Sequence, residues 1–282
     1  MTRGRAGRAG LGLAGPAILW TAAFFVVPLL VMAVQSLGQH VAGRAIPGWT
    51  LANYTRFFAK PYLYDALLNS LEVTALATVV SVLLAYPLAW IIAFRVPARG
   101  QRVALLLAIL PFWTSYLVRS YSWLLVLSPE GVVPSALRLL GLDLDTQLVS
   151  NRAGTVIGFV HFFTMLLTLT IYASLAQIPQ SCLRATADLG ASPLQAFLRV
   201  TLPLSAPGIV VGAFLTFVLA IGDYITPQIL GGNRELLLPQ AIMLQIGRQA
   251  DFPMASAMSL VLMLVVSLAY LACARWLRLE GT

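Results

Sequence analysis

The stretch RATADLGASPLQAFLRVTLPLSAPGI, residues 184–209, is a polar, helix-breaking segment between two long apolar runs. Gly190 is suited to close a short helix, because glycine is favoured just past a helix C-terminus. Ser192 followed by Pro193 is a typical helix start, since serine caps a helix and proline fits its first position. We therefore predict a structured loop of short helices between two membrane spans.

The same stretch contains further helix signals at both of its ends. Ser181 is expected to cap the first short helix. Pro203 and Pro207 are expected to interrupt the backbone before the next apolar run begins. A docking element for another protein fits this pattern, and an amphipathic hairpin that lies on the bilayer surface is the alternative.

The composition on either side of this loop is that of a membrane protein. Apolar residues make up 59% of the 282 residues and charged residues only 10%, whereas soluble domains carry roughly 25% charged residues. Six runs are long enough to cross a hydrocarbon core, which needs around 20 apolar residues per helix. They cover about 11–37, 67–94, 103–127, 153–176, 203–227 and 257–277, with a long link at 177–202.

These runs do not alternate as the strands of a membrane barrel would. The predicted fold class is an all-α polytopic membrane protein with six transmembrane helices, built as one domain over residues 1–282. Basic residues favour the cytoplasmic side, which predicts that both termini and the 177–202 link face the cytoplasm. The net charge of +8 follows from this topology, so lipid is expected as a contact and nucleic acid is not.

The chemistry-bearing residues predict neither a metal site nor a nucleotide site. His40 and His161 are far apart in the chain, and Cys182 and Cys273 are expected to be free thiols in a reducing compartment. Lys60 is the only lysine and has no glycine-rich loop before it, so the chain lacks a Walker A motif. No catalytic residue and no cofactor is predicted for this chain.

With these observations in place, the 184–209 stretch resembles the EAA loop of permease subunits from ATP-binding-cassette (ABC) importers. That family has the pattern E-A-A-x-x-x-G, followed by a hydrophobic residue and L-P at a fixed distance. The positions that match are Ala185, Gly190, Val200, Leu202 and Pro203, with Asp188 and Ala191 as supporting matches. Arg184 stands where the family has glutamate, and Thr186 where it has the second alanine.

The resemblance implies a type I ABC importer permease fold in the bacterial inner membrane, with this loop as cytoplasmic coupling helices. In that family the loop sits in a cleft of the ATPase and transmits nucleotide-driven closure. The expected partners are an ATPase dimer that uses ATP and Mg²⁺, a second, non-identical permease subunit and an extracytoplasmic substrate-binding protein. The residues expected to couple are Ala185, Asp188, Gly190, Ala191, Leu202 and Pro203.

Two further segments narrow the resemblance. LPFWTSYLVRSYSWLLVL (110–127) and AIGDYITPQILGG (220–232) are similar to the third and fifth spans of the spermidine/putrescine branch of these permeases. Related permeases for iron, opines and aminophosphonates share these segments. The resemblance therefore implies import of a small solute, with a polyamine favoured over those alternatives.

Ionisable residues inside spans are costly and are functional candidates. Glu72, Arg119 and Asp223 are expected at similar depth near the outer mouth of a pathway. Arg119 is expected to pair with Asp223 or with Glu72, because buried charges are normally paired. An acidic group left unpaired would attract a cationic solute, and Tyr121 and Tyr224 could add cation–π contacts or be ordinary packing residues.

Two other functional classes fit less well. Tyr64-Asp65 and Gly222-Asp223 resemble the paired motifs of intramembrane aspartyl proteases, but residue 220 is alanine and Asp65 falls at the edge of its span. A proton-coupled secondary transporter would not need the cytoplasmic loop. Both remain alternatives with less support than the ABC permease.

Overall fold

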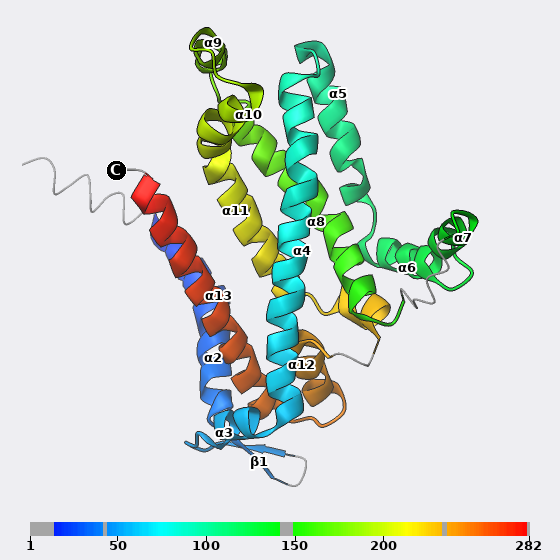
Figure 1. Cartoon of the computed structure of the whole chain (residues 1–282). Coiled ribbons are helices and arrows are strands. Elements are labelled where there is room, and N and C mark those ends of the chain that lie inside the picture. The colour runs from blue at the N-terminus through cyan, green and yellow to red at the C-terminus, as the bar shows by residue number, and fades with distance from the viewer. Residues whose placement is uncertain (1–13, 42–43, 142–148, 233–235, 281–282) are drawn as a thin grey trace, which may run out of the picture. The chain divides into compact units, whose positions relative to one another are not determined.

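The computed structural model describes residues 14–41, 44–141, 149–232 and 236–280 (Figure 1). Five of the described helices are long and apolar enough to cross a membrane: Ala14–Ser36, Pro61–Phe94, Arg152–Leu175, Pro193–Ile221 and Phe252–Arg275. A sixth candidate is a pair, Ala98–Trp113 and Tyr116–Leu139, bent by 88°. The described residues thus hold five candidate spans, or six if the bent pair counts as one, and the third span, expected over 103–127, is broken in its middle.

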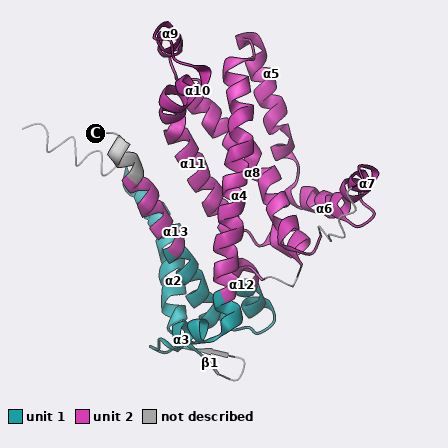
Figure 2. Cartoon of the chain, viewed as in Figure 1, with its two compact units in different colours: residues 1–64, 241–264 teal, residues 65–240, 265–282 magenta. Residues whose placement is uncertain are grey.

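The residue contacts group into two compact units, which Figure 2 colours separately. Unit 1 comprises residues 1–64 and 241–264, and unit 2 comprises residues 65–240 and 265–282. The expectation of one membrane domain over the whole chain remains a prediction.

Unit 1 contains the only hairpin in the described residues and short helices next to it. Its strands pair antiparallel, with Gln39 opposite Ile46 and His40 opposite Ala45. Its elements are η1 Ala22–Val26, α2 Val27–Ser36, β1 Gln39–Val41, β2 Arg44–Ile46, α3 Ala52–Ala59, most of α12 Leu238–Gly247 and the first part of α13 Phe252–Glu280. The described residues between the first two predicted spans, over 38–66, are therefore largely structured.

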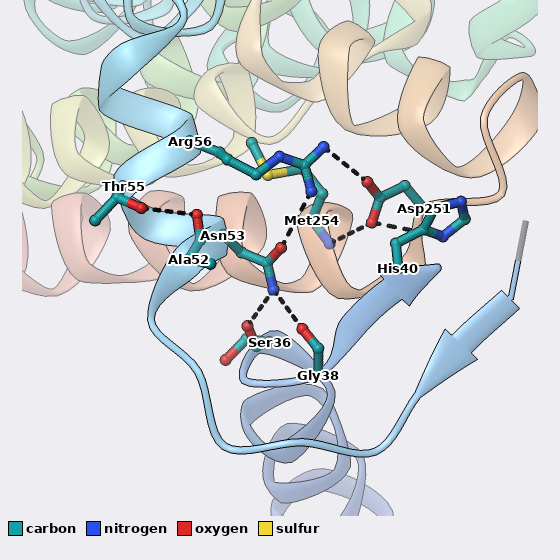
Figure 3. A network of polar contacts seen from close by, with 9 residues as sticks. All are labelled: Ser36, Gly38, His40, Ala52, Asn53, Thr55, Arg56, Asp251 and Met254. Carbon is teal, nitrogen blue, oxygen red and sulfur yellow. Dashed lines mark hydrogen bonds and ion pairs between the residues drawn. The ribbon is translucent and has the colours of Figure 1, made fainter. Parts of the chain in front are cut away.

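A buried carboxylate holds unit 1 together (Figure 3). The side chain of Asp251 is only 3% exposed, and its Oδ2 lies 3.2 Å from Nη2 of Arg56. Its Oδ1 accepts a hydrogen bond from the backbone N–H of Met254 at 3.0 Å and lies 3.9 Å from Nδ1 of His40. Asp251 thus caps α13 and joins it to α3 and the hairpin.

Asn53 extends this network toward α2 (Figure 3). Its Nδ2 donates to the carbonyl oxygens of Ser36 and Gly38, each at 2.8 Å. Those carbonyls lie at the end of α2, where the helix leaves backbone acceptors without partners. Three segments distant in sequence are therefore locked by buried polar contacts.

Unit 2 is a bundle in which α8 packs against both α4 and α11. Two apolar clusters form its core, with Ala77 and Ala89 of α4 facing Phe163 and Ile171 of α8. Its elements are α4 Pro61–Phe94 from residue 65 on, α5 Ala98–Ile109, η2 Leu110–Trp113, α6 Tyr116–Leu127, α7 Val132–Leu139, α8 Arg152–Leu175, α9 Gln180–Asp188, α10 Pro193–Ala196, η3 Phe197–Thr201, α11 Leu202–Ile221, η4 Pro227–Gly231 and the last part of α13.

Two glycines let α11 approach α8 closely. A Cβ atom on Gly208 would lie 2.3 Å from Oγ of Ser174, and one on Gly212 would lie 2.3 Å from Oγ1 of Thr170. Any larger residue would push the helices apart. The two spans that flank the 177–202 link are therefore in tight contact near the link itself.

Candidate functional site

The first helix of the link, α9, ends in a Schellman motif. It begins at Gln180 with Pro179 as N-cap, so the expected cap at Ser181 is wrong by two residues. Gly190 has a φ of +72°, and its N–H donates to the carbonyl of Ala187 at 3.0 Å while the N–H of Ala191 donates to that of Thr186 at 3.0 Å. Only glycine adopts this φ readily, so the predicted stop at Gly190 is confirmed.

The second helix starts with a full capping box. Ser192 Oγ accepts the backbone N–H of Gln195 at 3.3 Å, and Gln195 Oε1 accepts that of Ser192 at 2.9 Å. Pro193 occupies the first helical turn, as predicted from Ser192-Pro193. The sequence signals thus placed this helix start correctly.

The predicted interruption at Pro203 and Pro207 is wrong. One continuous helix runs from Pro193 to Ile221, through the π-turn η3, where the N–H of Leu202 bonds to the carbonyl of Phe197, five residues back. A π-turn widens the helix just where Pro203 cannot donate a hydrogen bond and would otherwise clash with the preceding turn.

The predicted coupling residues lie on the outside of this segment. Ala185, Asp188, Gly190 and Pro203 are exposed, whereas Ala191 and Leu202 are half-buried. Arg184, at the family's glutamate position, is exposed as well. Leu189 is 87% exposed next to Gly190. Figure 1 shows α9 at the same end of unit 2 as the turn between α4 and α5.

The second helix of the link is braced against α4. The rings of Phe197 and Tyr86 meet edge to face with centroids 5.6 Å apart, and the Tyr86 hydroxyl lies 3.1 Å from Oγ of Ser205. A cavity of about 280 Å³ lies between this contact and α9, with Trp90 and Leu183 in its wall. The second helix of the link is therefore continuous with α11 and in contact with α4.

The charged residues of the spans do not pair as expected. Glu72 forms an ion pair with Arg152 at 2.5 Å, although its side chain is 68% exposed. Arg119, only 9% exposed, donates from Nη1 to the carbonyl of Pro111 at 2.8 Å. In the described residues, its guanidinium pairs with neither Glu72 nor Asp223.

Aromatic rings take the place of a carboxylate around Arg119. Its guanidinium carbon lies 4.6 Å from the centroid of the Phe162 ring and 5.5 Å from that of Tyr116. Both distances are within the range of a cation–π contact. Arg119 also reaches back across the break between η2 and α6, because Pro111 lies on the other side of it. It therefore braces the 88° bend.

Asp223 lies beyond the end of α11, which stops at Ile221, and so is outside the helix in which it was expected. Its Oδ1 accepts the N–H of Ile225 at 2.8 Å and its Oδ2 that of Thr226 at 3.3 Å. The Tyr116 hydroxyl donates to Oδ2 as well. Among the residues that the structure describes, no cation forms an ion pair with this carboxylate.

Tyr121 and Tyr224 are exposed. Neither Arg152 nor Tyr116 was predicted as a partner of the two carboxylates. Arg152 was detectable from the sequence, because it stands at the start of the fourth predicted span, at a depth similar to that expected of Glu72. The part of the chain that the structure describes contains no cluster of three metal-binding side chains.

Comparison with known proteins assigns this sequence to a family. Residues 76–279 match the model of the binding-protein-dependent transport system inner membrane component family. The spermidine/putrescine transport system permease protein PotB of Escherichia coli (strain K12) is 32% identical over 262 residues, which cover 92% of this chain and 94% of PotB. The inner membrane ABC transporter permease protein YdcU of the same organism is 34% identical over 80% of this chain and 75% of its own length.

A solved structure shares the fold. A chain in the crystal structure of a bacterial alginate ABC transporter, in complex with an alginate pentasaccharide-bound periplasmic protein, superposes with a TM-score of 0.73 at 18% identity. The match covers 95% of this chain and 93% of that one. The protease and secondary-transporter alternatives are set aside, because the sequence relatives are transport permease proteins. The chain belongs to the binding-protein-dependent transport system inner membrane component family, and it is a multi-pass permease subunit of an ABC importer.

Proposed function

We propose that this subunit forms half of the translocation pathway for a polyamine, a small cation such as spermidine or putrescine. The observation that carries the proposal is Asp223, a half-buried carboxylate whose described partners are all neutral donors. No described cation pairs with this carboxylate, so a cationic solute can do so. The 32% identity with a permease named for spermidine and putrescine supports the same substrate class.

The other pathway candidates take different roles in this proposal. Glu72 is neutralised by Arg152 and contributes less attraction for a cation. Arg119 shapes the bend next to Asp223 rather than binding solute. Tyr224 is exposed directly beside Asp223, where its ring can meet an alkylammonium group. Asp223 and Tyr224 are thus the proposed solute contacts, with Tyr121 as an outer contact.

We also propose that the 177–202 link docks on a separate ATPase through residues 184–203. The support is geometric: Gly190 fixes the end of α9, the exposed Leu189 offers an apolar contact, and the capping box fixes the next helix. From Pro193 to Ile221 the helix has 29 residues, a rod about 40 Å long at 1.5 Å per residue. Its far end leads directly into Asp223.

Motion of the docked segment can therefore reach the solute contact through one rigid element. Closure of an ATPase dimer on ATP and Mg²⁺ would draw the segment inward and tilt α11, opening the pathway outward so that a binding protein can release its solute. Hydrolysis would reset it. This mechanism requires a second, non-identical permease subunit. In the proposed arrangement both termini face the cytoplasm, and lipid surrounds the spans. This chain itself needs no cofactor.

The test is solute uptake by the complete complex in proteoliposomes supplied with ATP and the loaded binding protein. We expect uptake of spermidine, and at least a tenfold loss in Asp223→Asn, because the charge is removed while the amide oxygen can still accept the N–H of Ile225. Glu130→Gln removes an exposed carboxylate outside the site and is the matched control. Unchanged uptake in Asp223→Asn, or uptake of an opine or aminophosphonate in place of spermidine, would contradict the proposed substrate class.

A further inference from the structure

Two breaks in membrane helices meet at a single side-chain contact in unit 2. The first break lies at Thr114–Ser115, between η2 and α6. The second lies at 222–224, just after α11. Tyr116, the first residue of α6, bridges them, because its hydroxyl donates to Oδ2 of Asp223 and also contacts Oγ1 of Thr226.

Non-helical backbone at membrane depth is tolerated where protein covers it or where it lines an aqueous cavity. In transporters such discontinuous helices commonly form the solute site. Two helix breaks meet at the carboxylate of Asp223. Its surroundings therefore have the features of a solute site. Figure 1 shows α6 in unit 2, next to the segment that follows α11.

The ring of Tyr116 is held so that its hydroxyl points at Asp223. Phe162 meets the ring edge to face at 5.2 Å, with an interplanar angle of 82°. The guanidinium carbon of Arg119 lies 5.5 Å from the ring centroid, and Arg119 is itself fixed by its bond to Pro111. The hydroxyl is thus a preorganised donor and does not sample the site at random.

The three described donors to Asp223 differ in how easily they can be replaced. The N–H groups of Ile225 and Thr226 belong to the turn that Asp223 itself starts, two and three residues on. Tyr116 is 107 residues away in sequence and comes from another element. Oδ2 carries both the Thr226 and the Tyr116 bonds. Rotation or withdrawal of α6 would remove the Tyr116 bond from this oxygen and leave its Thr226 bond, and so the turn, intact.

We propose that the Tyr116 hydroxyl occupies the position on Asp223 that an ammonium group of the solute takes, so that Tyr116 competes with the solute and sets its specificity. An ammonium makes a stronger charge-assisted bond to a carboxylate than a hydroxyl does. A solute that offers only hydroxyl groups gains nothing by replacing Tyr116. Tyr116 thereby selects for cations, an inference that rests on the proposed function and deepens it.

The experiment measures equilibrium binding of radiolabelled spermidine to the permease–ATPase complex in nanodiscs, without the binding protein. Tyr116→Phe and Tyr116→Met both remove the hydroxyl, and only the first keeps the ring. Both variants should bind spermidine about tenfold more tightly. In an Asp223→Asn background the same substitutions should give no gain. Tyr172→Phe, which removes the hydroxyl bond from α8 to Gln101, is the matched control and should leave affinity unchanged.

The outcomes separate the two proposals. Wild-type binding with equal or weaker affinity in both Tyr116 variants overturns the role of Tyr116 and leaves the substrate class standing. A gain of equal size in the Asp223→Asn background overturns it too, because the competition would then not be for that carboxylate. Absence of spermidine binding in the wild type and in every variant contradicts the proposed substrate class, and the inference with it.

Discussion

Replacing Gly190 with alanine should weaken docking of the ATPase, for a reason that lies in the backbone alone. Gly190 has a φ of +72°, and a Cβ at this position would meet no atom within 4 Å. The substitution therefore introduces no clash, and its cost is that of a left-handed conformation in a residue with a side chain, about 1–2 kcal/mol. If the loop must keep this conformation to dock, its competent population falls about 5- to 30-fold.

The assay is the affinity of the purified ATPase for the permease pair in nanodiscs, measured beside ATP-dependent uptake. Gly141 provides a matched control, because its φ is +75° and a Cβ there also meets nothing within 4 Å, yet it follows α7. Gly141→Ala should strain the backbone equally and leave docking unchanged. Gly190→Asn should be milder than Gly190→Ala, since asparagine tolerates this conformation better.

Gly190→Pro should be the most severe variant of this series. Proline fixes φ near −65°, and it removes the N–H that Gly190 donates to the carbonyl of Ala187. ATP-dependent uptake that persists in Gly190→Pro would refute the docking role. So would an equal loss of ATPase affinity in Gly141→Ala, because the effect would then be general destabilisation.

Substitutions at three further positions test contacts within each unit. Arg119→Lys should lower the thermal stability of the complex by about 1–3 kcal/mol, because lysine cannot keep both the Pro111 bond and the ring contacts; an unchanged melting temperature would contradict the brace. Asp251→Ala should lower stability by about 2–4 kcal/mol through loss of the α13 cap and the Arg56 pair, and Asp251→Asn by less, since asparagine still caps; equal losses would show that the cap contributes nothing. Glu72→Gln should change stability by less than about 1 kcal/mol, because its pair with Arg152 is largely exposed, and a tenfold fall in spermidine uptake would return Glu72 to the pathway.

The local helix signals were readable from the sequence where they depend on neighbouring residues only. Gly190 and the Ser192-Pro193 pair are such signals, because a Schellman motif and a capping box are built from residues within one turn. The apolar runs likewise located the spans, since bilayer thickness fixes their length. The family resemblance rested on the same short stretch and is confirmed.

The errors arose where tertiary context decides. Pro203 was expected to break the helix, but the π-turn at η3 absorbs it, and a single sequence gives no sign of that turn. The third span looked continuous, because its apolar run is unbroken. The bend is held by the bond from Arg119 to Pro111, a contact that the apolar run does not predict. Asp223 is bonded by Tyr116, which is 107 residues away in sequence, and spacing along the chain does not reveal such a partner.

The central claim is that a separate ATPase docks on the 177–202 link and drives this permease through it, and a photo-crosslink tests that claim most directly. A photoreactive amino acid at Leu189, 87% exposed at the end of α9, is compared with the same residue at Leu139, 89% exposed at the end of α7. Irradiation of the assembled complex should join the chain to the ATPase from position 189 and not from position 139. An adduct to the ATPase from 139, or none from 189 in a complex that hydrolyses ATP, would contradict the account.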